Sequence, residues 1–190
     1  MSAIPAFKIG VWNAWIFMSV FLLQMLVVFL GTKKVARRTG HPDDMRQDKY
    51  TRRVGAGMTV TWLAAMLYSV FLPFKLDTAW FYTGVVFFLL GVIVLVIATV
   101  NFSTAPMDKP IDNGIYRYSR HPMYLSMFLV YIGISITAAS WLFFLITIAS
   151  AVLQRMEAKL EEEYCLIKYG DSYREYLEVT PRWIGIPKQV

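Results

Sequence analysis

Four long stretches without a charged side chain divide the sequence into hydrophobic segments separated by short polar ones. Three of them are residues 11–31, 55–74 and 79–102, with Trp12 and Trp80 near the beginnings of the first and third. A helix rises about 1.5 Å per residue, so a segment of this length crosses a hydrocarbon core of about 30 Å. Tryptophan also favours the membrane interface. Each stretch is therefore predicted to form one transmembrane helix.

The fourth uncharged stretch, residues 123–154, is too long for a single membrane crossing. As one helix it would extend about 48 Å, well beyond the hydrocarbon core. Gly133 and the small residues Ala138, Ala139 and Ser140 lie near its middle. We therefore predict a helical hairpin, which gives an all-α transmembrane bundle of about five helices whose last two form that hairpin. Four transmembrane helices are the alternative.

Composition agrees with an integral membrane protein. The chain has 190 residues, of which 57% are hydrophobic and 17% charged, whereas soluble domains carry about 25% charged residues. We predict one integral membrane domain over residues 1–190, with three transmembrane helices in residues 11–102 and a functional region in residues 103–186. Residues 151–169 contain no Gly or Pro and predict a helix that ends at Gly170, followed by a tail interrupted by Pro181 and Pro187.

The net charge of +6 is concentrated between the first two predicted spans. The basic residues there are Lys33, Lys34, Arg37, Arg38, Arg46, Lys49, Arg52 and Arg53. By the positive-inside rule this segment faces the cytoplasm and the N-terminus lies outside. The hairpin then leaves residues 103–122 and the C-terminus in the cytosol, at the inner (cytoplasmic) membrane if the organism is prokaryotic. The lipid bilayer is thus the predicted partner, and the basic excess does not indicate nucleic acid.

Two polar segments, residues 108–124 and 157–176, flank the predicted hairpin. Because the ends of a hairpin lie together, we expect a polar pocket at the cytosolic mouth of an apolar bundle, suited to a water-soluble cofactor and a lipophilic substrate. Simpler interpretations stay open. Arg120-His121-Pro122 is compatible with a plain helix start, residues 161–163 with a solvated helix face, and the tyrosines with interfacial anchors.

Other kinds of site find little support in the sequence. His41, His121 and Cys165 are far apart, so no metal site is predicted, and a single cysteine excludes an internal disulfide. No glycine-rich nucleotide loop and no nucleophile elbow is present. A Ser-His-Asp arrangement around His121 stays open.

Several motifs follow one another in the second half of the chain. They are Gly114-Ile-Tyr-Arg-Tyr-Ser-Arg-His-Pro-Met-Tyr124, Glu161-Glu-Glu, Tyr169-Gly-Asp-Ser-Tyr-Arg-Glu-Tyr176 and Pro181-Arg182. In this order and spacing they resemble the isoprenylcysteine carboxyl methyltransferase family and its relatives, the phospholipid N-methyltransferases. The resemblance implies S-adenosyl-L-methionine as methyl donor. By position, it implies donor contacts from Asp108, Lys109, Pro110, Ile111, Tyr116, His121, Pro122, Met123, Tyr124 and Glu161.

The resemblance also implies a lipophilic acceptor that enters from the bilayer and presents a thiol, amine or carboxylate. We predict that the acceptor meets Arg120, Glu157 and Arg155. Glu157 stands where carboxyl methyltransferases of the family carry an arginine, and the family's His-x-Leu-Val stretch reads Asp108-Lys-Pro-Ile111. An acidic Glu157 fits an amine or thiol better than a carboxylate. An NADPH-dependent membrane reductase of related architecture and a non-catalytic membrane subunit are the alternative functions, and the sequence does not indicate an oligomeric state.

Overall fold

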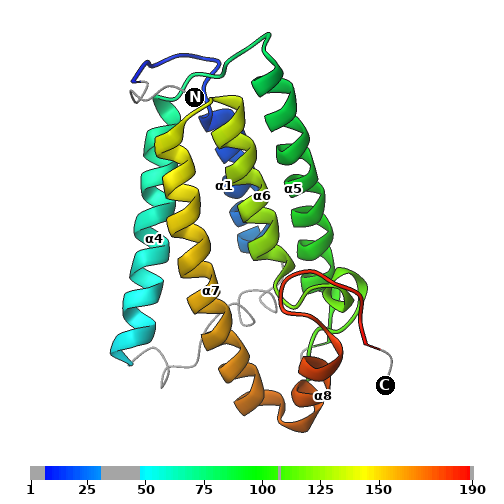
Figure 1. Ribbon diagram of the computed structural model, residues 1–190. Helices are drawn as coiled ribbons and strands as arrows, with labels where there is room; N and C mark the ends of the chain where they lie inside the picture. Colours follow the sequence, from blue (N-terminus) through cyan, green and yellow to red (C-terminus); the bar gives the residue numbers. More distant parts are fainter. Residues whose placement is uncertain (1–6, 31–47, 107, 189–190) are drawn as a thin grey trace.

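A computed structural model describes residues 7–30, 48–106 and 108–188 of the chain, and within these ranges its regular elements are helical (Figure 1). They are α1 (Trp15–Leu30), α4 (Lys49–Val70), α5 (Ala79–Thr104), the short 3-10 helix η1 (Gly114–Arg117), α6 (Pro122–Thr137), α7 (Trp141–Tyr169) and α8 (Asp171–Val179). The all-α prediction is confirmed for the described residues. His41 and the basic residues from Lys33 to Arg46 lie outside them, so the predicted orientation in the membrane stays a prediction.

Two of these helices, α5 and α7, are long and apolar enough to cross a membrane. Residues Trp15–Leu26 of α1 and the whole of α6 form shorter apolar helices. The helix predicted over residues 55–74 begins earlier, at Lys49, because the Asp48 carboxylate accepts hydrogen bonds from the Tyr50 and Thr51 amides. The number of five transmembrane helices remains a prediction.

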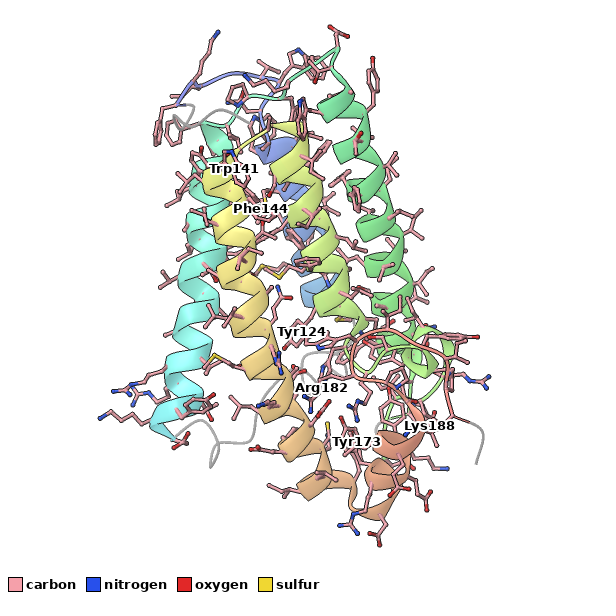
Figure 2. All side chains as sticks on the ribbon, viewed as in Figure 1. Tyr124, Trp141, Phe144, Tyr173, Arg182 and Lys188 are labelled. Atoms are coloured by element: carbon pink, nitrogen blue, oxygen red, sulfur yellow. The ribbon has the colours of Figure 1, made fainter. Side chains whose placement is uncertain are left out.

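The predicted hairpin is present as α6 and α7. The turn between them lies at the small residues 138–140, where Ala139 takes a positive φ of 48° and the Ser140 hydroxyl accepts a hydrogen bond from the Phe143 amide. Helix α7 continues without a break to Tyr169, so the apolar arm and the predicted C-terminal helix are one helix. Figure 2 shows Trp141 and Phe144 near the turn, with Tyr124, Tyr173 and Arg182 toward the opposite end.

Glycines set the distance between α5 and α6. A methyl group added at Gly84 would lie 2.5 Å from the Thr137 amide nitrogen, and one at Gly133 would lie 2.7 Å from the Phe88 amide nitrogen. Side chains larger than hydrogen do not fit such a contact, so the two backbones touch directly. This seam fixes the end of α6 against the start of α5, and it continues toward the polar segments at Gly91, where an added methyl group would lie 2.8 Å from the Val130 amide nitrogen.

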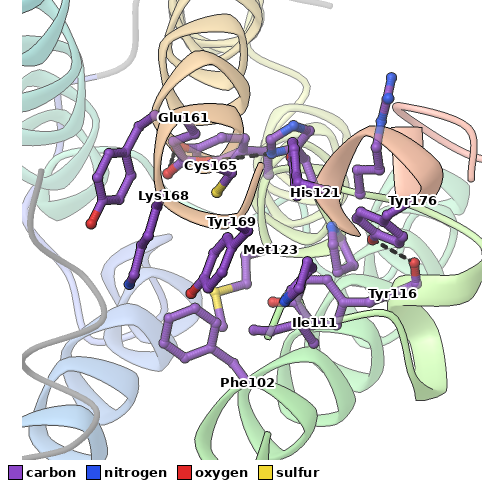
Figure 3. Close-up of a pocket in the computed structure, with 16 residues that line it drawn as sticks. Phe102, Ile111, Tyr116, His121, Met123, Glu161, Cys165, Lys168, Tyr169 and Tyr176 are labelled. Atoms are coloured by element: carbon purple, nitrogen blue, oxygen red, sulfur yellow. Dashed lines mark hydrogen bonds and ion pairs between the residues drawn. The ribbon is translucent and has the colours of Figure 1, made fainter. Parts of the chain in front are cut away.

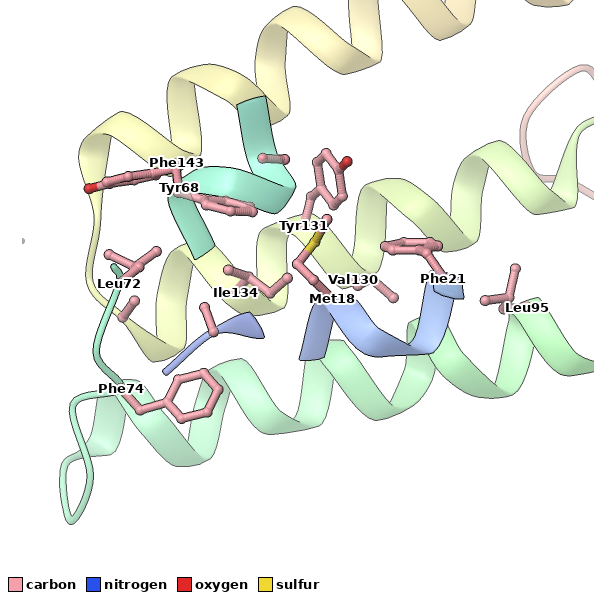
Figure 4. Close-up of a cluster of buried hydrophobic side chains, with 13 residues drawn as sticks. Met18, Phe21, Tyr68, Leu72, Phe74, Leu95, Val130, Tyr131, Ile134 and Phe143 are labelled. Carbon is pink, nitrogen blue, oxygen red and sulfur yellow. The ribbon is translucent and has the colours of Figure 1, made fainter. Parts of the chain in front are cut away.

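Helices α1, α4 and α7 pack with α5 and α6 around one apolar core (Figure 4). Its fully buried members include Met18 of α1, Tyr131 and Ile134 of α6, and Phe143 of α7. The Tyr131 ring contacts those of Phe21 and Phe143, with centroids 5.9 and 5.5 Å apart. The glycine seam thus holds α5 against α6, and the core holds α6 against α7. These contacts position the side chains at the polar ends of the three helices.

Candidate functional site

A cavity of about 250 Å³ lies where the polar ends of α5, α6 and α7 meet α8 (Figure 3). Its lining consists of Phe102, Pro110, Ile111, Tyr116, Arg120, His121, Pro122, Met123, Tyr124, Glu161, Tyr164, Cys165, Lys168, Tyr169, Tyr173 and Tyr176. The two polar segments singled out in the sequence therefore contribute to one cavity. Aromatic and apolar groups dominate its walls, and a small number of charged groups reach into it.

His121 sits at the beginning of α6 and is buried. Pro122 occupies the first helical turn, where a missing N–H is tolerated, and so starts α6 directly after the histidine. The two ring nitrogens face two different acids: Nδ1 lies 3.3 Å from Glu161, and Nε2 lies 3.1 Å from Glu162. When both nitrogens donate, the ring is an imidazolium bridging two carboxylates.

Burial and the two neighbouring carboxylates shift the pKa of His121 in opposite directions. Burial lowers the pKa of His121, but the hydrogen bonds and negative charges of Glu161 and Glu162 outweigh burial and raise this pKa above its ordinary value. The two carboxylates therefore stabilise the protonated, doubly donating form relative to that of an isolated histidine.

Glu161 connects this bridge to the cavity. The Tyr124 hydroxyl donates a hydrogen bond of 2.8 Å to Glu161 Oε1, and the Tyr124 ring stacks on His121 with centroids 5.6 Å apart. The Glu161 side chain is 40% exposed and lines the cavity, so one carboxylate is held in place and still accessible to a ligand.

Glu162 does not line the cavity and is paired with two arginines. Arg182 donates to both carboxylate oxygens, from Nε to Oε1 at 3.0 Å and from Nη2 to Oε2 at 2.5 Å. The Arg120 guanidinium lies 3.3 Å from Oε1. The Glu162 side chain is only 8% exposed, so these cations compensate a carboxylate that would otherwise be costly to bury.

Tyrosines of α8 close one side of the cavity. Gly170 ends α7 with a φ of 58°, a conformation that favours glycine, and the chain turns there into α8. Tyr173 and Tyr176 of α8 are buried, and the Tyr176 hydroxyl donates to the Tyr116 carbonyl oxygen at 2.7 Å. Lys168 lies over the rings of Tyr164 and Tyr169, 5.6 and 4.9 Å from their centroids.

Most residues predicted to contact the donor line this cavity. They are Pro110, Ile111, Tyr116, His121, Pro122, Met123, Tyr124 and Glu161, together with Arg120 from the predicted acceptor set. Asp108 and Lys109 are exposed and are not among the lining residues. Arg155 is exposed as well, and Glu157 is half-buried one helical turn before Glu161. Their roles toward a donor or acceptor remain predictions.

Sequence reasoning missed the part played by Glu162 and Arg182. The interpretation of residues 161–163 as a solvated face fits Glu163, which is exposed, but not Glu162. Lys168 and the α8 tyrosines lie in the predicted polar segment 157–176 but were not among the residues predicted to contact donor or acceptor. Among the described residues, no group of three metal-ligating side chains is present.

Comparisons with known proteins converge on one family. The sequence profile described as phospholipid methyltransferase matches residues 76–172, about half of the chain. Protein-S-isoprenylcysteine O-methyltransferase of Dictyostelium discoideum is 36% identical over 88 residues, which covers 40% of this chain and 32% of that protein. The chain thus spans about a third of the length of this relative. The profile match extends from the segment before α5 to the first residues of α8 and includes nearly all of the cavity.

Proposed function

The chain belongs to the phospholipid methyltransferase family, and on this premise we propose that it transfers a methyl group from S-adenosyl-L-methionine to an acceptor held in the membrane. The observation that carries the proposal is the joint lining of one cavity by the start of α6 and the charged end of α7. These segments are the ones that carry the methyltransferase motifs.

The side chains that line the cavity suit S-adenosyl-L-methionine. This molecule carries a sulfonium cation and a zwitterionic amino-acid group next to a flat base. Glu161 offers a carboxylate to a positive charge, and Tyr116, Tyr124 and Tyr173 offer aromatic faces. His121 and Arg120 complete the polar wall, and Ile111, Pro122 and Met123 provide apolar contacts.

S-adenosyl-L-methionine, when bound, supplies a methyl group that its sulfonium already activates. The chain's own residues have three tasks: to hold the donor, to align the acceptor and to keep water out. Glu161, fixed by Tyr124 and His121, serves the first task. The buried tyrosines of α8 serve the third, because they cover the cavity with aromatic surface.

An amine or thiol acceptor is proposed rather than a carboxylate. A carboxylate would need a cation at the acceptor position, but Arg120 is already paired with Glu162. The position one turn before Glu161 is Glu157, which repels a carboxylate and suits a group that must lose a proton before it attacks. The acceptor would approach from the bilayer, along the apolar part of the bundle.

Binding of S-adenosylhomocysteine, the form of the donor that has lost its methyl group, tests the identity of the proposed methyl donor. Purified protein in detergent is expected to gain thermal stability with S-adenosylhomocysteine and not with NADPH, since ligands that bind the folded state stabilise it. A shift with NADPH alone would refute the proposal in favour of a reductase.

Incubation of membranes with a methyl-labelled donor then tests the acceptor. Vesicles containing ethanolamine phospholipid are compared with vesicles supplied with a prenylated thiol or a prenylcysteine carboxylate. Label in the amine lipid or the thiol supports the proposal, and label only in the carboxylate refutes the acceptor assignment. A family member without catalysis would incorporate no label.

A further inference from the structure

We propose that Arg182, in the segment that follows α8, is a positioning residue that fixes the methyl-donor site through Glu162 and His121. The inference rests on the proposed function, because it takes the cavity as the donor site. Arg182 does not line that cavity, and it lies ten residues beyond the region that matches the family profile.

Arg182 binds the Glu162 carboxylate through two guanidinium nitrogens, Nε and Nη2. The two hydrogen bonds, of 3.0 and 2.5 Å, go to different oxygens of the carboxylate. This bidentate geometry fixes the rotation of the carboxylate plane, which a single point charge does not. Glu162 Oε1 is the atom that faces His121 Nε2, so the orientation of the acid determines where the ring can bond.

The ring transmits this constraint to the cavity. His121 uses its other nitrogen to contact Glu161, the carboxylate that lines the cavity. A continuous series of contacts thus runs from Arg182 through Glu162 and His121 to Glu161. Loss of Arg182 leaves Glu162 Oε2 without the partner it has here, which frees the acid to rotate and the ring to follow.

The backbone around Arg182 is also bound to the segment that precedes His121. The Arg120 amide donates to the Pro181 carbonyl at 3.1 Å, and the Gly185 amide donates to the Tyr118 carbonyl at 3.1 Å. The Arg120 side chain donates to the Leu177 carbonyl at 3.3 Å. The C-terminal segment therefore holds the guanidinium of Arg182 at a defined distance from α6 and α7.

The charged residues around His121 predict a pH effect of Arg182 substitution that a residue with a purely structural role would not produce. Around His121 stand Glu161 and Glu162 of α7, Arg120 and Tyr124 on its own segment, Arg182 of the C-terminal segment, and Tyr173 of α8 across the cavity. Removal of one cation from this group makes the surroundings of the imidazole more negative. The pH at which His121 loses its proton must then rise.

The experiment measures S-adenosylhomocysteine binding by the full-length protein in detergent, by calorimetry across the pH range in which His121 titrates. Arg182→Gln is expected to weaken binding about tenfold or more, which corresponds to about 1.4 kcal/mol, and to move the pH midpoint upward. Arg182→Lys keeps the charge and is expected to restore the midpoint but only part of the affinity. Arg174→Gln is the matched control, because Arg174 forms an exposed pair with Asp171 on α8.

Wild-type affinity in Arg182→Gln, or weaker binding with an unchanged midpoint, would overturn the proposal. If Arg182→Gln does not fold, the double variant Arg182→Gln/Glu162→Gln removes the buried charge as well. This variant is expected to bind as well as Glu162→Gln alone, and binding weaker than that of Glu162→Gln would overturn the proposal. The midpoint is also read from thermal unfolding without ligand, so a wild-type protein that does not bind S-adenosylhomocysteine refutes the proposed function and leaves this test intact.

Discussion

The Tyr124 hydroxyl of α6 donates a hydrogen bond of 2.8 Å to the Glu161 carboxylate of α7. The two residues lie at the end of the hairpin opposite its turn, and the contact closes this open end. It also leaves Glu161 exposed to the cavity on one side and fixed on the other. The properties of the site therefore depend on how firmly α6 and α7 are held together.

Replacement of Glu161 by Gln is expected to reduce donor affinity by about tenfold or more, since a hydrogen bond to a charged group contributes about 1.5–3 kcal/mol. S-adenosylhomocysteine and a cationic donor analogue are compared by calorimetry, and the loss should be larger for the cation. Glu163→Gln, on an exposed neighbouring position, is the control and should bind as the wild type does. Equal losses in both variants would contradict a direct role for Glu161.

Tyr124→Phe keeps the aromatic ring and removes only the hydroxyl. The ring stacking on His121 should persist, and we expect a loss of about 0.5–1.5 kcal/mol in stability, the usual net contribution of one hydrogen bond. A double-mutant cycle with Glu161→Gln isolates this contact. If the two substitutions are additive, the hydroxyl does not act through Glu161.

Gly133→Ala places a methyl group against the backbone of α5. The nearest atoms are the Phe88 nitrogen at 2.7 Å and the Gly84 oxygen at 2.8 Å, so the helices must separate. Overpacking of this kind costs about 1–3 kcal/mol and should lower the unfolding temperature. Gly55→Ala on α4 meets no atom within 4 Å and should be neutral or slightly stabilising. A destabilisation of the same size at Gly55 would show that the seam is not the cause.

Stability is expected to depend on pH through His121. Because the pKa of His121 is raised in the folded protein, its contribution is complete below the unfolded value of about 6.5 and disappears as the pH rises through the folded value. The unfolding temperature of the wild type should therefore fall over that interval relative to His121→Gln. If the two proteins show parallel curves, the imidazolium bridge does not stabilise the fold.

The hydrophobic pattern was sufficient to predict the long apolar helices and the hairpin, because long uncharged segments and small turn residues indicate where such helices lie. The small residues 138–140 mark the turn, and Gly170 marks the end of α7. The start of α4 was misplaced because the pattern follows charge, whereas the helix begins at a cap provided by Asp48. The helix α8 was not predicted, since a nine-residue amphipathic segment between Gly170 and Pro181 resembles a tail.

The candidate site was predictable as far as its residues share one helix face or one motif. His121, Tyr124 and Glu161 belong to motifs, and the hairpin brings them together. The partners of Glu162 were not predictable, because Arg182 reaches it from a segment whose path depends on tertiary hydrogen bonds. Neighbouring acids in a sequence do not reveal which one is buried.

The unbroken course of α7 has a mechanical consequence. Its apolar half and its acid-bearing half are one stiff rod, so a tilt imposed at one end is transmitted to the other. A bilayer thinner or thicker than the apolar length of the helix changes that tilt. Glu161 and Glu162 would swing with the rod while His121 stays on α6. With α7 spanning the membrane as predicted, we therefore expect the distance between His121 and Glu161 to depend on the thickness of the surrounding bilayer.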